Sequence, residues 1–161
     1  MPERTLQAWR IDKAKRAKTS FSGEGAALEG GRWNPPDFPV VYLSESLAMA
    51  ALEKLVHLPM PEGLAARFIR FQVSFPAAMV EVFPVSELPE DWADKPVPVS
   101  TQRLGALWLQ ELRSGILAVP SAIIPSERNF LVNPRHPDFQ KLRIGKPEAF
   151  PFDPRLQRPH A

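Results

Sequence analysis

Arg32 is the first residue whose type and position suggest a binding site. It directly follows a pair of glycines that ends at Gly31. Paired glycines adopt backbone shapes closed to other residues and let a ligand approach closely. The guanidinium of Arg32 is a planar fork of donors that suits a phosphate or a carboxylate. A turn with an exposed arginine explains the same residues equally well. The pattern therefore indicates either an anion site or an ordinary turn.

Tyr42 and Glu53 come next along the chain, and each has a structural explanation of its own. Tyr42 lies within the apolar run 40–43, which favours burial, but its ring would serve equally as a stacking surface for a flat heterocycle. Glu53 lies on the polar side of an expected helix, where an exposed carboxylate paired with His57 is the ordinary expectation. Local pattern alone assigns neither residue to a function.

Ser121 and Asn133 stand at the ends of expected strands. Ser121 follows Pro120 and Asn133 precedes Pro134, and both are ordinary turn residues in such positions. Polar groups at strand ends also often line sites that a rigid scaffold holds in place. Their positions make both residues candidates for a site.

Several kinds of site lack support in the sequence. Without cysteine, disulfides and cysteine-based zinc sites are excluded. The histidines are widely scattered and no HExxH motif is present, so we expect no metal. A Ser-His-Asp triad stays open, but the GxSxG, GxGxxG and GxxxxGK[ST] motifs are missing. The histidines are His57, His136 and His160.

Length and composition bound the class of protein. The 161 residues suffice for one domain with a real core, and 44% apolar with 24% charged residues fits a globular chain. No run approaches the roughly 20 apolar residues that span a bilayer, and the N-terminus has no secretory signal. The net charge of +2 is too small to demand a nucleic-acid partner. We expect a cytoplasmic domain that binds neither membranes nor nucleic acid directly.

The helices that must position these residues are expected to be short, because 19 prolines interrupt the chain. One helix is expected over 46–58, with Ser44 as its N-cap. A second is expected over 101–113, with Gly115 just past its end. The apolar face expected for the first helix comprises Leu47, Ala48, Ala51, Leu52, Leu55 and Val56.

The remaining segments read as short strands and loops, which together predict a mixed α+β domain. Residues 21–31 are glycine-rich and read as a loop, and residues 84–98 as an irregular segment with Trp92 as a buried anchor. The basic run 13–18 is typical of a solvated face, or else of a segment that meets an anion or a partner. Strands are expected over 6–11, 40–43, 68–75, 80–83, 116–119, 129–132 and 142–144.

The order of several sequence blocks resembles the RES domain family, which is named for arginine, glutamate and serine. The blocks extend over almost the whole chain, whereas 60–101 matches only loosely. The specific part is GGRWN followed by YLSES, a helix and a glutamate. The matching blocks are WRI (9–11), FSGEGAALEGGRWN (21–34), VVYLSESLAMAALEKLVH (40–57), VPSAIIPSERNFLVNPRHPDF (119–139) and FPFDPRL (150–156).

The resemblance implies that residues 1–161 form the toxin of a bacterial type II toxin–antitoxin pair. Its implied partner is an Xre-like antitoxin with a helix-turn-helix domain, with a dimer within their complex. Its implied fold is α+β and ADP-ribosyltransferase-like: a split mixed β-sheet with short flanking helices and a cleft for NAD. Its implied activity is the destruction of NAD⁺ by cleavage of the nicotinamide–ribose bond, with water or phosphate as acceptor and with no cofactor besides this substrate.

The resemblance also assigns roles to residues. Arg32 would hold the pyrophosphate and ribose side, Tyr42 would pack on the nicotinamide ring, and Glu53 would stabilise positive charge or orient the attacking group. These three are the implied catalytic residues. Asp37 departs from the glycine expected after the GGRWN turn, which leaves the loop shape open. Residues implied to bind NAD⁺ besides Arg32 and Tyr42 are Arg10, Gly31, Ser121 and Asn133, with Ser126 as an alternative to Ser121.

Two other functions stay open at this point. The first is an ADP-ribosyltransferase that modifies a protein, which labelled NAD⁺ would distinguish by labelling that protein. The second is a non-catalytic module that uses the basic run 13–18 to bind nucleic acid or a partner. That module would show salt-dependent binding and no effect on NAD⁺.

Overall fold

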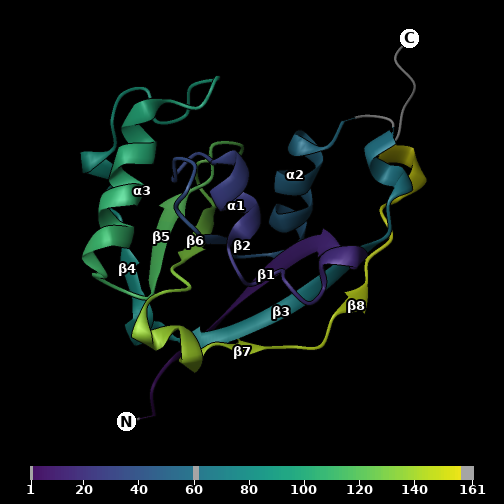
Figure 1. Ribbon diagram of the computed structural model, residues 1–161, viewed down its shortest axis with the longest axis horizontal. Coiled ribbons are helices and arrows are strands. Elements are labelled where there is room, and N and C mark those ends of the chain that lie inside the picture. The colour runs from purple at the N-terminus through teal and green to yellow at the C-terminus, as the bar shows by residue number, and fades with distance from the viewer. Residues whose placement is uncertain (1, 60–61, 157–161) are drawn as a thin grey trace.

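The backbone of the computed structural model, described for residues 2–59 and 62–156, forms an eight-stranded mixed sheet (Figure 1). His160 lies outside the described residues. The strands are β1 (Thr5–Lys13), β2 (Val41–Ser44), β3 (Phe68–Pro76), β4 (Val80–Val82), β5 (Ile116–Pro120), β6 (Arg128–Val132), β7 (Arg143–Ile144) and β8 (Glu148–Ala149). Their order is β4-β5-β6-β2-β1-β3-β7, and β8 pairs with β3. Each strand expected from the sequence is confirmed, and β8 is an addition.

The sheet divides between β1 and β2. Along β1 the pairing with β3 is continuous from Thr5↔Pro76 to Lys13↔Phe68, whereas the register between β1 and β2 is recorded at Trp9↔Ser44 alone. In Figure 1 the strands β1 and β3 run across the direction of β5 and β6. β4 and β5 are parallel, and the other pairs described are antiparallel. The predicted α+β class and split mixed sheet are confirmed.

Short helices flank the sheet: α1 (Glu24–Glu29), α2 (Leu47–His57) and α3 (Val99–Glu111). The expectation of a loop over 21–31 is wrong, because that segment contains α1. Gly23 and Gly30 bracket this helix with φ values of 79° and 75°. The glycines that read as loop residues are therefore its caps. In the described ranges no helix is long and apolar enough to cross a membrane.

The ends of the two longer helices differ from the expectation. Ser46, not Ser44, caps α2, since its hydroxyl accepts a hydrogen bond from the Met49 amide at 3.0 Å. Ser44 belongs to β2. The C-cap of α3 is Leu112, which adopts a left-handed conformation with φ 52°, so Gly115 is not needed to end the helix.

The face that α2 turns to the sheet also differs from the expectation. Leu52 and Val56 were assigned to the apolar face but are 37% and 54% exposed. Met49 and Ala50 are buried instead. Their helical spacing of three and four places Glu53 and Lys54 on the same inward side. A helix face judged by hydrophobicity alone misses this arrangement, because two of its inward residues are charged.

A hydrophobic cluster fixes α2 against β1 and β3. It contains Ile11, Ala50 and Phe68, with Leu47 and other half-buried residues packed against it. The tail contributes Phe152, whose ring meets that of Phe68 edge-on at 5.1 Å. The cluster therefore holds the helix that carries Glu53 on the β1 side of the split sheet.

Candidate functional site

The Glu53 carboxylate is held by one of its oxygens. Ser121 Oγ donates a hydrogen bond to Glu53 Oε1 at 2.8 Å, and Asn129 Nδ2 donates to the same oxygen at 2.7 Å. In the described part of the chain, no donor lies within hydrogen-bond distance of Oε2. The expected pairing of Glu53 with His57 is wrong. Glu53 thus presents one fixed oxygen and one oxygen without a protein donor.

Ser121 follows β5 and is fully buried. Its Oγ accepts hydrogen bonds from the amides of Ile123 and Ile124 at 3.1 and 3.2 Å. Because these amides occupy the acceptor side of the hydroxyl, its proton is directed to Glu53. Ser126 lies exposed in the following turn, so the structure joins Ser121, not Ser126, to Glu53.

Asn129 is a member of the site that the sequence did not reveal. It lies in β6, opposite Ser44 on β2 and Val119 on β5. Ser44 Oγ donates to Asn129 Oδ1 at 2.8 Å, which turns the amide nitrogen toward Glu53. Its place at the start of an expected strand, beside the end of another, is the signal that could have identified it.

Asn133, the asparagine predicted for the site, lies at the opposite end of β6. It is buried, its Nδ2 donates to the Leu109 carbonyl at 3.2 Å, and its Oδ1 accepts from the Arg135 amide at 3.0 Å. These bonds anchor the turn after β6. The length of β6 separates Asn133 from Asn129, so Asn133 does not belong to the Glu53 network, and a contact of Asn133 with NAD⁺ stays a prediction.

Arg32 is fixed without a carboxylate partner. Its Nη1 donates to the carbonyls of Trp92 and Asp94 at 2.8 and 3.0 Å. Among the ion pairs formed by residues 2–59 and 62–156, none involves Arg32. The irregular segment 84–98 therefore holds the side chain by neutral acceptors and leaves its positive charge uncompensated.

Helix α3 fixes the backbone of the GGRWN turn. Thr101 Oγ1 donates to the Arg32 carbonyl at 2.5 Å, and Gln102 Nε2 donates to the Gly31 carbonyl at 3.1 Å. At Gly105 an added Cβ would overlap the Trp33 carbonyl oxygen. Only glycine allows this close approach of helix and turn. The sequence pattern gives no sign of this contact, because an isolated glycine inside a helical pattern is usually tolerated without a special role.

Tyr42 ties the same turn to β2. Its hydroxyl donates to Asn34 Oδ1 at 2.6 Å and accepts from the Trp33 amide at 3.2 Å. A Cβ at Gly31 would lie 2.7 Å from this hydroxyl. Glycine at position 31 therefore leaves room for the Tyr42 side chain. The Tyr42 hydroxyl is engaged in hydrogen bonds with Asn34 and Trp33.

The charges of Arg32 and Glu53 both affect the pKa of Tyr42. Burial raises the pKa of the Tyr42 hydroxyl well above its ordinary value, while the hydrogen bond from the Trp33 amide and the charge of Arg32 lower that pKa. The negative charge of Glu53 raises the pKa further. Arg32 and Glu53 thus lie within electrostatic range of one tyrosine, which stays neutral at physiological pH.

The backbone conformation of Asp37 accounts for an aspartate where the RES family pattern has glycine. Its φ of 76° lies in the left-handed region that favours glycine. Aspartate is one of the few other residues that adopts this region readily. The loop therefore keeps a shape that glycine would also take.

Arg10, also predicted to bind substrate, has its donors engaged within the protein. Nε donates to Ser20 Oγ at 2.8 Å, Nη1 to the Tyr42 carbonyl at 3.1 Å, and Nη2 to Asp12 Oδ2 at 3.3 Å. Asp12 is buried and compensates the charge. Arg10 is adjacent to the site through Tyr42 but, unlike Arg32, is neutralised.

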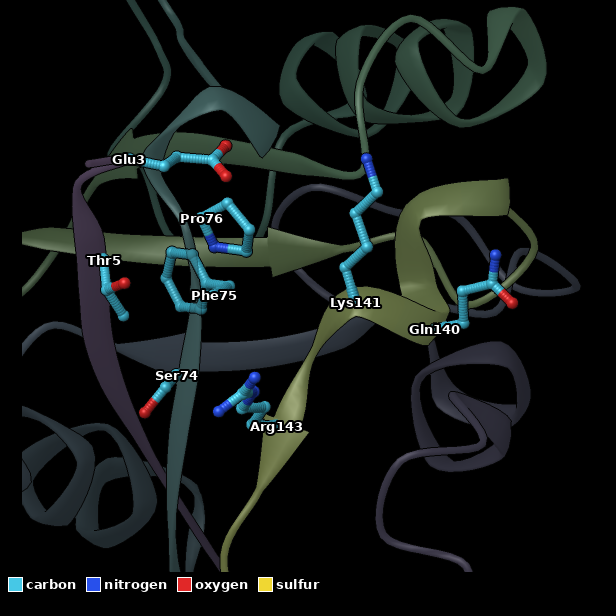
Figure 2. A pocket seen from close by; sticks show the side chains of 8 residues that line it. All are labelled: Glu3, Thr5, Ser74, Phe75, Pro76, Gln140, Lys141 and Arg143. Atoms are coloured by element: carbon cyan, nitrogen blue, oxygen red, sulfur yellow. The ribbon is translucent and has the colours of Figure 1, made fainter. Parts of the chain in front are cut away.

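A cavity of about 650 Å³ lies elsewhere, where β1 begins and β3 ends (Figure 2). Its charged side chains are exposed and of both signs, and Lys141 is already paired with Asp138 at 3.1 Å. None of the predicted site residues lines it. We place the site at Glu53, where Ser121 and Asn129 orient a carboxylate. The lining residues are Glu3, Thr5, Ser74, Phe75, Pro76, Gln140, Lys141 and Arg143.

Among the residues that the structure describes, no three histidine, aspartate or glutamate side chains are grouped so that they could hold one metal ion. The network at Glu53 consists of its carboxylate, the hydroxyls of Ser121 and Ser44 and the amide of Asn129, and the Tyr42 hydroxyl lies within electrostatic range of Glu53 and of the uncompensated Arg32 guanidinium. Such a set can bind an anion and, close by, stabilise a positive charge that develops during a reaction.

Comparison with known proteins places the chain in a family. The sequence model of the RES domain matches residues 7–153. "Toxin Res" of Yersinia enterocolitica is 35% identical over 94% of this chain and 100% of its own length. The "Prs ADP-ribosylating toxin" of Sphingobium sp. is 36% identical over 96% of this chain and 98% of its own.

A solved structure shares the fold. A chain from the crystal structure of the M. tuberculosis MbcT–MbcA toxin–antitoxin complex superposes with a TM-score of 0.74. The match covers 92% of this chain and 85% of that one, at 22% identity. Since the family match and the relatives extend over nearly the whole sequence, this protein belongs to the RES domain family of toxins.

Proposed function

We propose that this toxin depletes NAD⁺ by cleaving the bond between nicotinamide and ribose. The observation that carries the proposal is that neither the Glu53 carboxylate nor the Arg32 guanidinium has an oppositely charged partner among the described residues. Glu53 is oriented through Oε1 by neutral donors and has Oε2 available, while Arg32 has no carboxylate partner in the described chain. A substrate with an anionic pyrophosphate beside a sugar that becomes cationic complements both charges.

Glu53 would act on the ribose. As the nicotinamide leaves, positive charge develops on the ring oxygen and the anomeric carbon, and a nearby carboxylate lowers the energy of that state. Ser121 and Asn129 fix the carboxylate before the substrate arrives, so little reorganisation accompanies the reaction. Both donors are neutral, so they leave the negative charge of Glu53 uncancelled.

Arg32 and Tyr42 would bind the substrate on either side of the bond that breaks. The free donors of Arg32 suit the pyrophosphate oxygens. The hydroxyl of Tyr42 is occupied by Asn34 and Trp33, so this residue would contribute the face of its ring and not a proton. Stacking of that face on the nicotinamide ring is the role we assign to it.

The reaction balances without a redox step. The carbon–nitrogen bond breaks with its electron pair passing to the nicotinamide, which leaves as a neutral molecule. An oxygen of water or phosphate forms the new bond to the anomeric carbon. With water the products are ADP-ribose, nicotinamide and a proton, and with phosphate the sugar product is the 1-phosphate of ADP-ribose. Glu53 Oε2 would accept the hydrogen bond of the attacking group.

The test follows NAD⁺ concentration over time with purified protein, with and without phosphate. We expect the wild type to consume NAD⁺ and the Glu53→Gln variant to be slower by about 1,000-fold. Glutamine retains an oxygen that can accept from Ser121 and Asn129, so the fold should persist. Chromatography of the products identifies the acceptor.

Glu45→Gln is the matched control. Glu45 precedes the same helix and accepts a hydrogen bond from the Arg128 amide at 2.8 Å, outside the Glu53 network. Its turnover should stay within about twofold of the wild type. Turnover by Glu53→Gln equal to that of Glu45→Gln would remove Glu53 from the reaction, and an inactive wild type would refute NAD⁺ cleavage.

Transfer of ADP-ribose to a protein is a second candidate, favoured by the name of the Sphingobium relative. The same charges would serve it, since the bond that breaks is the same and only the acceptor differs. Incubation with adenine-labelled NAD⁺ in a bacterial extract distinguishes the two. Label in free ADP-ribose or its phosphate supports cleavage, and label in a protein band supports transfer.

We propose an antitoxin as the protein partner, because the structural neighbour was solved in a toxin–antitoxin complex. An Xre-like protein with a helix-turn-helix domain remains the expected type. Expression of the toxin alone should arrest growth, and co-expression with such a protein encoded by an adjacent gene should restore it. Continued arrest on co-expression would exclude that protein as the antitoxin.

A further inference from the structure

Asp12 lies at the centre of a second polar network, which is linked to the Tyr42 carbonyl through Arg10. The residue is 2% exposed. Its Oδ2 accepts hydrogen bonds from Arg10 Nη2 at 3.3 Å and Ser20 Oγ at 2.8 Å. Its Oδ1 accepts from the Lys13 amide at 2.8 Å and lies 3.8 Å from Lys54 Nζ. Both oxygens of this carboxylate are therefore engaged inside the protein.

Two of these contacts lead to the site. Arg10 Nη1 reaches across from β1 to the Tyr42 carbonyl on β2, at the split where backbone pairing is recorded only at Trp9↔Ser44. Lys54 is the residue after Glu53 on α2. Asp12 thus contacts one side chain that holds the strand of Tyr42 and another from the helix of Glu53.

The cations around Asp12 would repel one another without it. The side chains of Arg10 and Lys54 are 22% and 25% exposed, so solvent screens their charges only in part. Burial, followed by the charges of Arg10, Arg16 and Lys13, lowers the pKa of Lys54, whereas Asp12 raises it. Removal of the carboxylate would leave clustered positive charge between β1 and α2.

We propose that Asp12 is a positioning residue for the reaction at Glu53, acting through Arg10 on the β2 backbone at Tyr42 and through Lys54 on α2. The inference rests on the proposed function for the effect on turnover. Arg10 then serves as a bridge that closes the split sheet beneath the site. This role replaces the substrate contact expected from the sequence, because its donors and its charge are already committed.

Arg10→Lys is the most informative single variant. Lysine keeps the charge opposite Asp12, but one ammonium group cannot reproduce the planar fork that joins Asp12, Ser20 and the Tyr42 carbonyl. We expect kcat to fall by about 10- to 100-fold, KM to change by less than about threefold, and Tm to stay within about 3 °C of the wild type. A residue that bound NAD⁺ directly would raise KM instead.

Asp12→Asn leaves cations unpaired and is expected to be both unstable and slow. The double variant Arg10→Gln/Asp12→Asn removes the charge pair, so Tm should recover while kcat remains low. Arg113→Gln is the control, because Arg113 pairs with Glu81 at 3.1 Å on the exposed surface near β4. Recovery of kcat together with Tm in the double variant would show that Asp12 acts on stability alone and would overturn the proposal.

Hydrogen–deuterium exchange tests the positioning independently of any substrate. Peptides covering β2 and α2 should exchange faster in Arg10→Lys and in the double variant than in the wild type or Arg113→Gln. Unchanged exchange in both segments would refute the inference even if NAD⁺ is the substrate. If the wild type fails to consume NAD⁺, the proposed function falls while the exchange result still decides the role of Asp12.

Discussion

Glu53 and Asp12 are inward-facing carboxylates with opposite surroundings. Asp12 meets the cations Arg10 and Lys54, and both of its oxygens accept hydrogen bonds. Among residues 2–59 and 62–156, Glu53 accepts hydrogen bonds only from the neutral donors Ser121 and Asn129, both on the same oxygen. A carboxylate paired with internal cations is neutralised by the fold. One held by neutral donors keeps its charge for a group that arrives from outside, and this difference separates the structural network from the site.

The largest expected effect on folding stability comes from the Asp12 carboxylate. Asp12→Asn should lower the free energy of unfolding by about 3 kcal/mol, because it leaves partly buried cations without their partner. Glu53→Gln should lower it by less than about 1 kcal/mol, since the amide oxygen still accepts both hydrogen bonds. Urea denaturation measures both values. Equal losses would remove the distinction between the two carboxylates.

Arg32→Gln tests the cation that has no internal partner. We expect kcat/KM for NAD⁺ to fall by about 100-fold, which corresponds to about 2.7 kcal/mol, with a rise in KM as the main component. The free energy of unfolding should fall far less than in Asp12→Asn. Among the described residues, the Arg32 side chain donates only to the carbonyls of Trp92 and Asp94. Steady-state kinetics measure the effect, and an unchanged KM and kcat would exclude Arg32 from binding.

Ser44→Ala tests whether Ser44 orients Asn129, which in turn donates to Glu53. Loss of the hydroxyl frees the Asn129 amide to rotate, so kcat should fall by about tenfold, or about 1.4 kcal/mol. Ser22→Ala is the control, since that hydroxyl donates to the Thr19 carbonyl on the exposed surface. Equal activity of the two variants would show that the amide is held by other means.

The smallest expected effect concerns Tyr42, which lies between the two networks and is the single tyrosine of the chain. Because burial raises its folded pKa above the unfolded value of about 10, its contribution to stability is complete below pH 10. Above that pH the contribution declines, by about 0.8 kcal/mol at pH 10.5. Denaturation at pH 9 and pH 10.5 measures this loss.

Tyrosinate absorbance reports the same group directly. The native protein should show little tyrosinate at pH 10.5, whereas the denatured protein should be more than half ionised. Glu53→Gln should lower the pKa of Tyr42, because the negative charge that raises it is removed. Ionisation of the native wild type near pH 10 would contradict the burial of this hydroxyl.

Much of the fold was predictable because local signals agree with it. An alternating run marks β1, an apolar run ended by Pro76 marks β3, and helix formers between a serine cap and Pro59 mark α2. Helix α1 escaped prediction because its capping glycines resemble a loop. The inward face of α2 escaped because Glu53 and Lys54 find partners that are distant in sequence.

The site was predictable only in part, and mainly through the resemblance to a family. The resemblance to the RES family singled out Arg32, Tyr42, Glu53 and Ser121, and the structure brings Glu53 to Ser121 and to within electrostatic range of Tyr42. It named Asn133 and did not name Asn129. The two residues belong to opposite ends of one strand, and the choice between them depends on which end faces α2.

The sequence by itself determined the short elements, the absence of cysteine chemistry and the family, because these depend on local composition and on the order of motifs. The tertiary structure decided which polar groups meet. Ser121 and Asn129 lie 68 and 76 residues from Glu53 along the chain, yet both bond to one of its oxygens. Whether a charge is compensated depends on such long-range neighbours, and this separates Arg32 from Arg10 and Glu53 from Asp12.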